Sequence, residues 1–214
     1  MHAEQYLEVF KPIPPNCKIR TEWKVSEVID KLKSAIVVRE ATMYDDATND
    51  KLSYGIYNII HIGAGGFDGQ KNSIVDVPGV AVPTDQPDHL IEYPTNNITT
   101  ALYRIAGEDY NEVHIQPGFG KPMGLDVPIL HGLGTMGIVA RLVIDIYGNK
   151  QVSCSKAIKA RFTATANVGE TLMIKLWKRK QRVHFQVTVK ETGRIHVNNA
   201  FIDLHELPTV PSKL

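Results

Sequence analysis

The feature that most constrains the fold is an almost wholly apolar segment that runs from about Gly132 to Tyr147 and is closed by Gly148. Its length and its closing glycine predict a helix. A helix that is apolar on nearly all sides must be enclosed by other structure. The segment also carries Arg141 and Asp145 and is too short to span a bilayer, so we expect a buried helix and no membrane association.

Alternating residues on both sides of this helix predict the strands that enclose it. Residues 182–190 alternate strictly, with valine and phenylalanine on one side and polar residues on the other. Further strands are expected at 157–164, 171–179 and 195–204. Before the helix, β-rich runs occupy 17–25, 34–44 and 52–62, and a short strand is expected at 74–82. Together these elements predict an α+β protein.

The distribution of prolines and helix caps divides the chain into two halves. Pro83, Pro87 and Pro94 punctuate a polar stretch, so we interpret residues 83–94 as a linker between a first half at 1–82 and a second half at 95–214. The second half begins with a shorter helix, which Thr95 or Asn96 caps and Gly107 ends.

Composition excludes several classes of function. The formal net charge of +1 lacks the basic excess of a nucleic-acid-binding protein. The two cysteines, Cys17 and Cys154, are too few for a disulfide framework and have no metal-ligand spacing, so no metal site is expected. The chain ends in Ser212-Lys213-Leu214, the tripeptide that the peroxisomal import receptor reads, and we therefore expect a peroxisomal protein.

Three polar residues follow the shorter helix closely: Asp109, Asn111 and His114. Five positions separate Asp109 from His114, which sets the two side chains apart on a helix and on opposite faces of a strand. They meet only if the backbone curls, as in a loop after Gly107. A carboxylate and an imidazole that meet can hold one water and move its protons. On spacing alone, a surface loop with unconnected polar residues is an equally good interpretation.

Two longer motifs, at 103–115 and 128–137, resemble the signature of the hydratase 2 family of MaoC-like dehydratases. They read Tyr-Arg-Ile-Ala-Gly-Glu-Asp-Tyr-Asn-Glu-Val-His-Ile and Pro-Ile-Leu-His-Gly-Leu-Gly-Thr-Met-Gly. The similarity continues through 156–162 and reaches back to 2–8, so it covers nearly the whole chain. The family includes peroxisomal (3R)-specific 2-enoyl-CoA hydratases and the hydratase part of peroxisomal multifunctional enzyme type 2.

The resemblance implies a double hotdog fold, in which each half is a curved antiparallel sheet and the long helix lies in the second half. It implies reversible hydration of trans-2-enoyl-CoA to (3R)-3-hydroxyacyl-CoA in peroxisomal β-oxidation, with no cofactor and with a homodimer as the assembly. The implied catalytic residues are Asp109, Asn111, His114 and Gly132. The implied substrate-binding residues are His2, Ala3, Lys31, Tyr110 and Phe162.

The implied chemistry is physically consistent with these residues. The backbone N–H of Gly132, at the amino end of the buried helix, can polarise the thioester carbonyl as negative charge develops on it. Asp109 and His114 would activate the water between them, and Asn111 would orient the water or the imidazole. We interpret His131 as a residue that starts the helix rather than as a third catalytic group.

The chain departs from the family pattern in three respects. Glu112 replaces a proline, which adds a carboxylate beside the expected site, and one extra residue, Glu108 or its neighbour, lies between Gly107 and Asp109. The sequence also begins where the family's first half is already under way, so either this sequence starts within a longer chain or the first half lacks its leading segment. Two alternatives therefore stay open: a hotdog acyl-CoA thioesterase, which an assay for free thiol would reveal, and a non-catalytic acyl-CoA-binding subunit, which would not turn over crotonyl-CoA.

Overall fold

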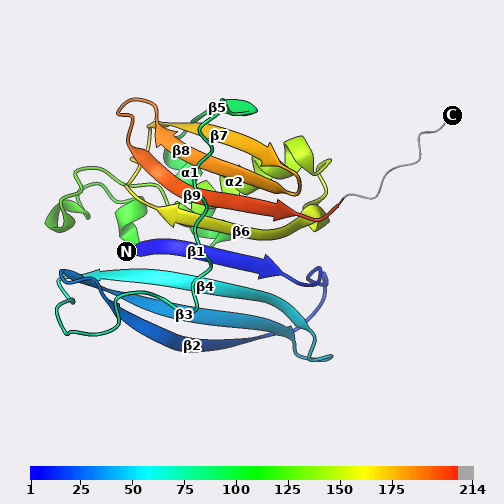
Figure 1. Cartoon of the computed structure of the whole chain (residues 1–214). Coiled ribbons are helices and arrows are strands. Elements are labelled where there is room, and N and C mark those ends of the chain that lie inside the picture. Colours follow the sequence, from blue (N-terminus) through cyan, green and yellow to red (C-terminus); the bar gives the residue numbers. More distant parts are fainter. Residues whose placement is uncertain (207–214) are drawn as a thin grey trace.

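The structure, a computed structural model that describes residues 1–206, is built on one antiparallel sheet (Figure 1). The described strands lie in the order β2-β3-β4-β1-β6-β9-β8-β7-β5. The strands are β1 (His2–Val9), β2 (Ile19–Asp30), β3 (Ser34–Asp45), β4 (Lys51–Ile62), β5 (His89–Pro94), β6 (Ser155–Phe162), β7 (Thr171–Arg179), β8 (Arg182–Val189) and β9 (Ile195–Leu204). The helices are α1 (Asn97–Ala106) and α2 (Gly132–Tyr147), and 3-10 turns cover Glu112–His114, Lys121–Met123 and Val152–Cys154.

The two halves of the molecule share this sheet. Strands β1 to β4 form the first half, β5 to β9 form the second, and β1 pairs with β6 at the boundary. In that pairing Tyr6 lies opposite Lys159, and Leu7 lies opposite Ile158. Both helices lie on the second half, behind the sheet in Figure 1. The α+β double hotdog prediction, with its long helix in the second half, is confirmed.

Helix α2 and the strands of the second half enclose the main core. The helix begins at Gly132 and ends at Tyr147 before Gly148, as its apolar run predicts. Val139 and Val143 on its sheet-facing side are fully buried. They belong to a cluster that includes Leu172, Ile174, Leu176, Val183, Phe185, Val187 and Ile202. Burial of each such side chain contributes about 1.5–3 kcal/mol, so the alternating strands and the apolar helix stabilise each other. None of the helices within residues 1–206 is long and apolar enough to cross a membrane.

Residues 63–88, here named the strap, cross the face of the sheet opposite α2 (Figure 1). The strand expected at 74–82 was wrong, because this part of the strap pairs with no strand. Val75 and Val77 instead pack on a small apolar cluster of β2, β3 and β4. Side chains from the second half bind strap carbonyls: Lys159 Nζ donates to Val77 O, and Asn199 Nδ2 donates to Val80 O at 2.9 Å.

The expected linker at 83–94 was also wrong at its carboxyl end, where His89–Pro94 forms β5 and pairs with β7. Strand β5 lies at the edge of the sheet, so each residue bonds to a partner on one side alone. An edge position tolerates a proline, because the missing N–H faces away from the neighbouring strand. Pro94 therefore ends a strand here, although its position beside other prolines is typical of a linker.

Candidate active site

The loop after α1 brings Asp109 and His114 together. Helix α1 begins at its cap Asn96 and ends at Gly107, as predicted, and Glu108 then adopts a left-handed conformation with φ of 52°. This turn reverses the chain, and Asn111 caps the 3-10 turn Glu112–His114 by accepting a hydrogen bond from Val113 N at 3.2 Å. The curl places Asp109 Oδ2 4.0 Å from His114 Nε2. That separation is too long for a direct hydrogen bond and short enough for one water to bond to both groups.

A backbone carbonyl determines which nitrogen of His114 faces Asp109. Nδ1 of His114 lies 2.8 Å from the carbonyl oxygen of Ile129. Because a carbonyl oxygen can only accept, Nδ1 carries the proton. In the neutral ring, Nε2 then presents its lone pair toward the Asp109 carboxylate. Nε2 of the neutral ring is therefore free to accept a hydrogen bond from a water placed between it and Asp109.

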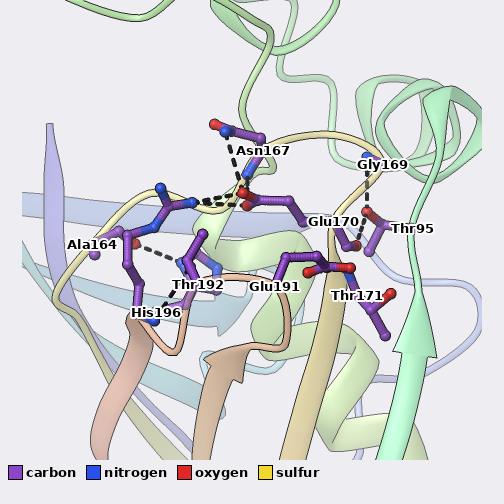
Figure 2. A network of polar contacts seen from close by, with 10 residues as sticks. Thr95, Ala164, Asn167, Gly169, Glu170, Thr171, Glu191, Thr192 and His196 are labelled. Carbon is purple, nitrogen blue, oxygen red and sulfur yellow. Dashed lines mark hydrogen bonds and ion pairs between the residues drawn. The ribbon is translucent and has the colours of Figure 1, made fainter.

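The segment that carries Ile129 is itself held by the loop between β6 and β7. Ile129 forms an isolated bridge with Asn167, and Leu130 N donates to Ala166 O at 2.8 Å. Figure 2 shows how Glu170 holds that loop from beside β7, and its carboxylate accepts from Asn167 N at 2.6 Å. The guanidinium of Arg194 donates to both oxygens of Glu170 at 2.9 Å. This network, which no motif indicated, fixes the carbonyl that orients His114.

His131 lies at the centre of the site. Only 4% of the residue is exposed, and its ring stacks on that of His114 with 3.7 Å between centroids and 26° between planes. Nε2 of His131 lies 3.9 Å from Asp109 Oδ2, and the ring of Tyr103 covers its other side at 4.4 Å. Burial, aided by the nearby His114, lowers the pKa of His131 to about 4. His131 does precede the first residue of α2, as predicted, but its side chain makes no capping hydrogen bond.

Asp109, His114 and His131 are also the described residues that come nearest to a metal site. Their ligand atoms all lie within 4.8 Å of one another. Ligands of a tetrahedral zinc ion lie about 3.3 Å apart, given bonds of about 2.0 Å. The measured separations of 3.9 and 4.0 Å from Asp109 are wider than that. A zinc site here would therefore need the three groups to move closer together.

Gly132 begins α2 and lies against Phe162. A Cβ atom at Gly132 would approach Cδ1 of the Phe162 ring to 3.0 Å, so this position has no room for a side chain unless the ring moves. Like every helix, α2 leaves its first N–H groups without partners in the helix, and these groups point out of its amino end. The ring of His2 meets Phe162 edge-on at 5.3 Å. Gly132, Phe162 and His2 are thus brought together, with His131 next to them in the chain.

The other expected binding residues lie farther out. Ala3 follows His2 on β1, and Tyr110 is 61% exposed beneath the guanidinium of Arg104, 5.2 Å from its ring centroid. Lys31 lies in the turn between β2 and β3, where Nζ donates to Lys71 O at 2.6 Å. This turn is at the same end of the sheet as His2, but three strands away from β1.

The unexpected carboxylate of Glu112 is paired within the loop. Its Oε1 accepts from Arg104 Nη2 at 2.9 Å, and Arg104 comes from the last turn of α1. The pair ties the 3-10 turn back to the helix that precedes it. Glu112 therefore replaces the family's proline without adding an unpaired negative charge beside Asp109.

A groove of about 750 Å³ runs along α2. Leu7 of β1, Tyr57 of β4 and Tyr103 of α1 line it opposite apolar residues of α2, among them Leu133, Met136 and Ala140. Tyr103 also contacts the ring of His131, so this one side chain lies between the groove and the cluster of Asp109, His114 and His131. Its lining is largely apolar and comes from both halves of the sheet.

A continuous antiparallel sheet packed on one long helix defines a double hotdog protein, and a carboxylate and two imidazoles lie at the amino end of that helix. Residues 80–200 match the family model of the MaoC like domain, and residues 1–63 match that of the MFE-2 hydratase 2 N-terminal domain. The chain belongs to the MaoC-like dehydratase family, in the branch that carries the hydratase 2 N-terminal domain.

Individual relatives agree with this assignment. The chain is 37% identical to peroxisomal multifunctional enzyme type 2 of Mus musculus, over 95% of the chain and 27% of that protein. It is 32% identical to peroxisomal enoyl-CoA hydratase 2 of Arabidopsis thaliana, over 97% of the chain and 69% of that protein. The solved full-length multifunctional enzyme type 2 of Drosophila melanogaster superposes with a TM-score of 0.87 at 33% identity, over 96% of this chain and 37% of that one. The chain thus spans about a quarter of the mouse enzyme.

Proposed function

We propose that the protein hydrates trans-2-enoyl-CoA reversibly to (3R)-3-hydroxyacyl-CoA, by syn addition and without a cofactor, in peroxisomal fatty-acid β-oxidation. The observation that carries the proposal is the 4.0 Å separation between Asp109 and His114 at the amino end of α2. The assignment of the chain to the MaoC-like family and the name of its plant relative, an enoyl-CoA hydratase 2, support the same reaction.

In the proposed mechanism, Asp109 and His114 share the attacking water. The thioester carbonyl accepts a hydrogen bond from Gly132 N–H, which stabilises negative charge on that oxygen. As the water oxygen bonds to C3, the π electrons move to C2 and the thioester becomes an enolate. Asp109 and His114 together take one proton from the water and deliver one proton to C2, so no net proton is gained or lost.

The groove along α2 is proposed to receive the acyl chain. Its volume of about 750 Å³ and apolar lining suit a hydrocarbon chain, and one of its lining residues, Tyr103, contacts the ring of His131. His2, Ala3, Lys31, Tyr110 and Phe162 are proposed to contact the substrate. Variation of the enoyl chain length in kcat/KM measurements tests the assignment of the groove.

Turnover of crotonyl-CoA, followed by loss of the enoyl absorbance, is the direct test. We expect the absorbance to fall without release of free thiol. Free thiol would instead establish an acyl-CoA thioesterase, and tight binding of crotonyl-CoA with neither signal would establish a non-catalytic acyl-CoA-binding subunit.

The stereochemistry of the product is a sharper test. Asp109, His114 and Gly132 belong to one local unit, so they present water to one face of a bound enoyl group. We expect a product that a 3R-specific hydroxyacyl-CoA dehydrogenase oxidises and that a 3S-specific dehydrogenase refuses. A 3S or racemic product would contradict the proposed arrangement of water and substrate even if hydration occurs.

Peroxisomal location is proposed from the relatives' names and from Ser212-Lys213-Leu214 as a contact for the import receptor. These three residues lie outside the described part of the chain. A fluorescent protein that bears the chain's last residues should collect in peroxisomes, and removal of Leu214 should leave it in the cytosol. Cytosolic fluorescence with the intact tail would contradict this assignment.

A homodimer is proposed as well. Three apolar side chains of α1 point into solvent: Ile98, Leu102 and Ile105 are 64%, 63% and 73% exposed. An exposed apolar stripe of this kind is typical of a protein–protein interface. Sedimentation equilibrium should give twice the chain mass, and Leu102→Glu should shift the equilibrium toward the monomer. A native protein that sediments as a monomer would rule the dimer out.

A further inference from the structure

His131 is a buried polar side chain whose ring nitrogens form no hydrogen bond of ordinary geometry among residues 1–206, although the backbone of Asp109 lies close enough to act on the ring. Removing such a group from water without a partner costs about 1–3 kcal/mol. Its backbone conformation before α2 requires no imidazole, since the side chain makes no capping bond. The start of the helix therefore does not explain why this residue is a histidine. Its position next to Asp109 and His114 offers an explanation.

The environment of the ring keeps it uncharged. Tyr103 covers one face and His114 the other, Asp109 lies at its edge, and Arg104 is the further charged group close enough to act on it. Burial and the nearness of His114 lower the pKa of His131 to about 4. An uncharged imidazole has one N–H to donate and one lone pair, so at neutral pH it can donate to a carboxylate without a positive charge of its own.

Asp109 offers the acceptors near the ring, its backbone carbonyl and its carboxylate, and the carboxylate is the one that belongs to the proposed chemistry. Its Oδ1 already accepts from Asn111 N at 3.2 Å, whereas Oδ2 faces the Nε2 atoms of both histidines, at 4.0 Å for His114 and 3.9 Å for His131. Asp109 is 43% exposed on its side chain, so it is free to rotate toward solvent unless something holds Oδ2. A contraction of under an ångström, on closing around a substrate, would bring His131 N–H into bonding distance.

We propose that His131 is a positioning residue for the hydration step, which donates a ring N–H to Asp109 and holds the imidazole plane of His114 by stacking. The inference rests on the proposed hydratase function. It assigns the site three coupled side chains rather than two: His131 orients the carboxylate from the buried side, and the Ile129 carbonyl orients His114. Neither His131 nitrogen touches the substrate.

Two substitutions separate the hydrogen bond from the packing. His131→Phe keeps an aromatic face against His114 but has no N–H. His131→Gln has an amide N–H that can reach the position of Nε2 but no ring. We expect kcat of the Phe variant to fall by about 10–100-fold with KM within about threefold, because positioning acts on the chemical step. The kcat of the Gln variant should be higher than that of the Phe variant, by at least about a third of the Phe variant's loss on a logarithmic scale.

The pH profile supplies a readout that loss of packing alone would not change. A hydrogen bond to the ionised carboxylate lowers its pKa, so its removal in the Phe variant should move the acid limb of the kcat profile upward by about one pH unit. His89→Gln is the control, because His89 lies on β5 beside Tyr147 at the opposite end of α2. Native kcat in the Phe variant would overturn the proposal. So would equal losses in the Phe and Gln variants with an unmoved acid limb.

NMR of the resting protein separates this inference from the function itself. ¹⁵N-labelled histidine rings, assigned by the loss of signals in the variants, should show His131 as a neutral ring with one protonated nitrogen at pH 6. A doubly protonated His131 ring at that pH would overturn the inference whatever the turnover. A neutral His131 ring in a protein that does not hydrate crotonyl-CoA would instead contradict the proposed function alone.

Discussion

At the scale of single residues, the site depends on side chains that are each held by a backbone group. Asn111 N–H holds one oxygen of Asp109, and the Ile129 carbonyl holds Nδ1 of His114. Backbone groups move less than side chains, so a water placed between Asp109 and His114 would meet an imidazole that is already oriented and a carboxylate held at one of its two oxygens. Preorganisation of this kind lets the reaction proceed without a rearrangement of the site.

The acid–base pair can be tested directly. Asp109→Asn and His114→Gln should each lower kcat by about a hundredfold or more while thermal unfolding stays near native, because each removes a proton acceptor from the shared water. The double variant should be little worse than either single variant, since both side chains act on one water. Steady-state kinetics on crotonyl-CoA measures all three. Near-native turnover in either single variant would disprove the assignment of the pair.

Gly132 is proposed to contribute a backbone N–H donor. A backbone group cannot be removed by changing a side chain, so the test compares two substitutions. Gly132→Ala adds a Cβ that meets Phe162 at 3.0 Å, and Gly132→Pro adds a similar obstruction and also removes the N–H. Proline suits the first helical position, and His131 before it has the extended ψ of 128° that precedes proline well. We expect kcat/KM of the Pro variant to fall about a hundredfold below that of the Ala variant, for loss of about 3 kcal/mol of stabilisation. Equal rates in the two variants would leave Gly132 with a packing role only.

At the scale of elements, the site depends on how a short segment is fastened between α1 and α2. Residues 128–130 bond to the loop between β6 and β7 on one side and orient His114 on the other. Glu170 fastens that loop by accepting from Asn167 N and from Arg194. Glu170 therefore helps to fix the tautomer of His114, although it contacts none of Asp109, His114 and Gly132.

Glu170→Gln should accordingly affect both stability and rate. Hydrogen bonds to a charged group contribute about 1.5–3 kcal/mol, so we expect a loss of about that size in the free energy of unfolding. We also expect kcat to fall several-fold with KM unchanged, because the Ile129 carbonyl is held less firmly. Glu191→Gln is the matched control, since Glu191 accepts from Thr171 N nearby but is exposed (Figure 2). Equal kcat in the two variants would show that the network serves stability alone.

The elements show what local pattern can and cannot predict. Both helices begin and end where caps, glycines and apolar periodicity place them, because those signals are local. The strap and β5 were misjudged, because Val75 and Val77 find their partners on β2 to β4, and Pro94 is tolerated only at a sheet edge. Each depends on neighbours that are distant in the sequence.

The site itself divides in the same way. Motif resemblance predicted Asp109, His114 and Gly132 as catalytic residues, which stays a prediction, and the curl that was expected to bring Asp109 and His114 together is present. The importance of the His131 side chain, the pairing of Glu112 with Arg104 and the role of Glu170 were not predicted. The stacking of His131 on His114 and the hydrogen bond between Glu170 and Arg194 both arise from the packing of separate elements. The spacing of these residues along the chain therefore does not predict the contacts.

At the scale of the whole molecule, a buried ionic cluster joins the two halves and the strap. Lys159 of β6 is 1% exposed on its side chain and binds Glu4 of β1 at 2.6 Å and Asp76 of the strap at 3.2 Å. Burial raises the pKa of the Glu4 carboxyl to about 7, against the opposing effect of Lys159 and with a smaller contribution from Asp76. The cluster therefore couples protonation to the joining of three segments.

The pH dependence of stability follows from the sign of this shift. The Glu4 carboxyl in the folded state holds its proton up to a pKa of about 7, whereas the unfolded chain releases it near 4.5. Its contribution is full below about pH 4.5 and is lost as the pH rises to about 7. In urea unfolding, the free energy of unfolding of the native protein should therefore fall between about pH 4.5 and 7 by more than that of the Glu4→Gln variant. Glu8→Gln, on the same strand, should keep the native slope; an unchanged slope in Glu4→Gln would refute the coupling.

The position of β1 in the middle of the sheet has a consequence for how the chain is made. Leu7 pairs with Ile158, so one long edge of β1 stays open until β6 has been synthesised. Contacts between such distant residues raise the contact order and slow folding. In the meantime the nascent first half presents an unpaired strand to the ribosome's surroundings, which is the kind of surface that chaperones cover. The groove along α2, which residues of both halves line, can therefore form only after the second half has been synthesised.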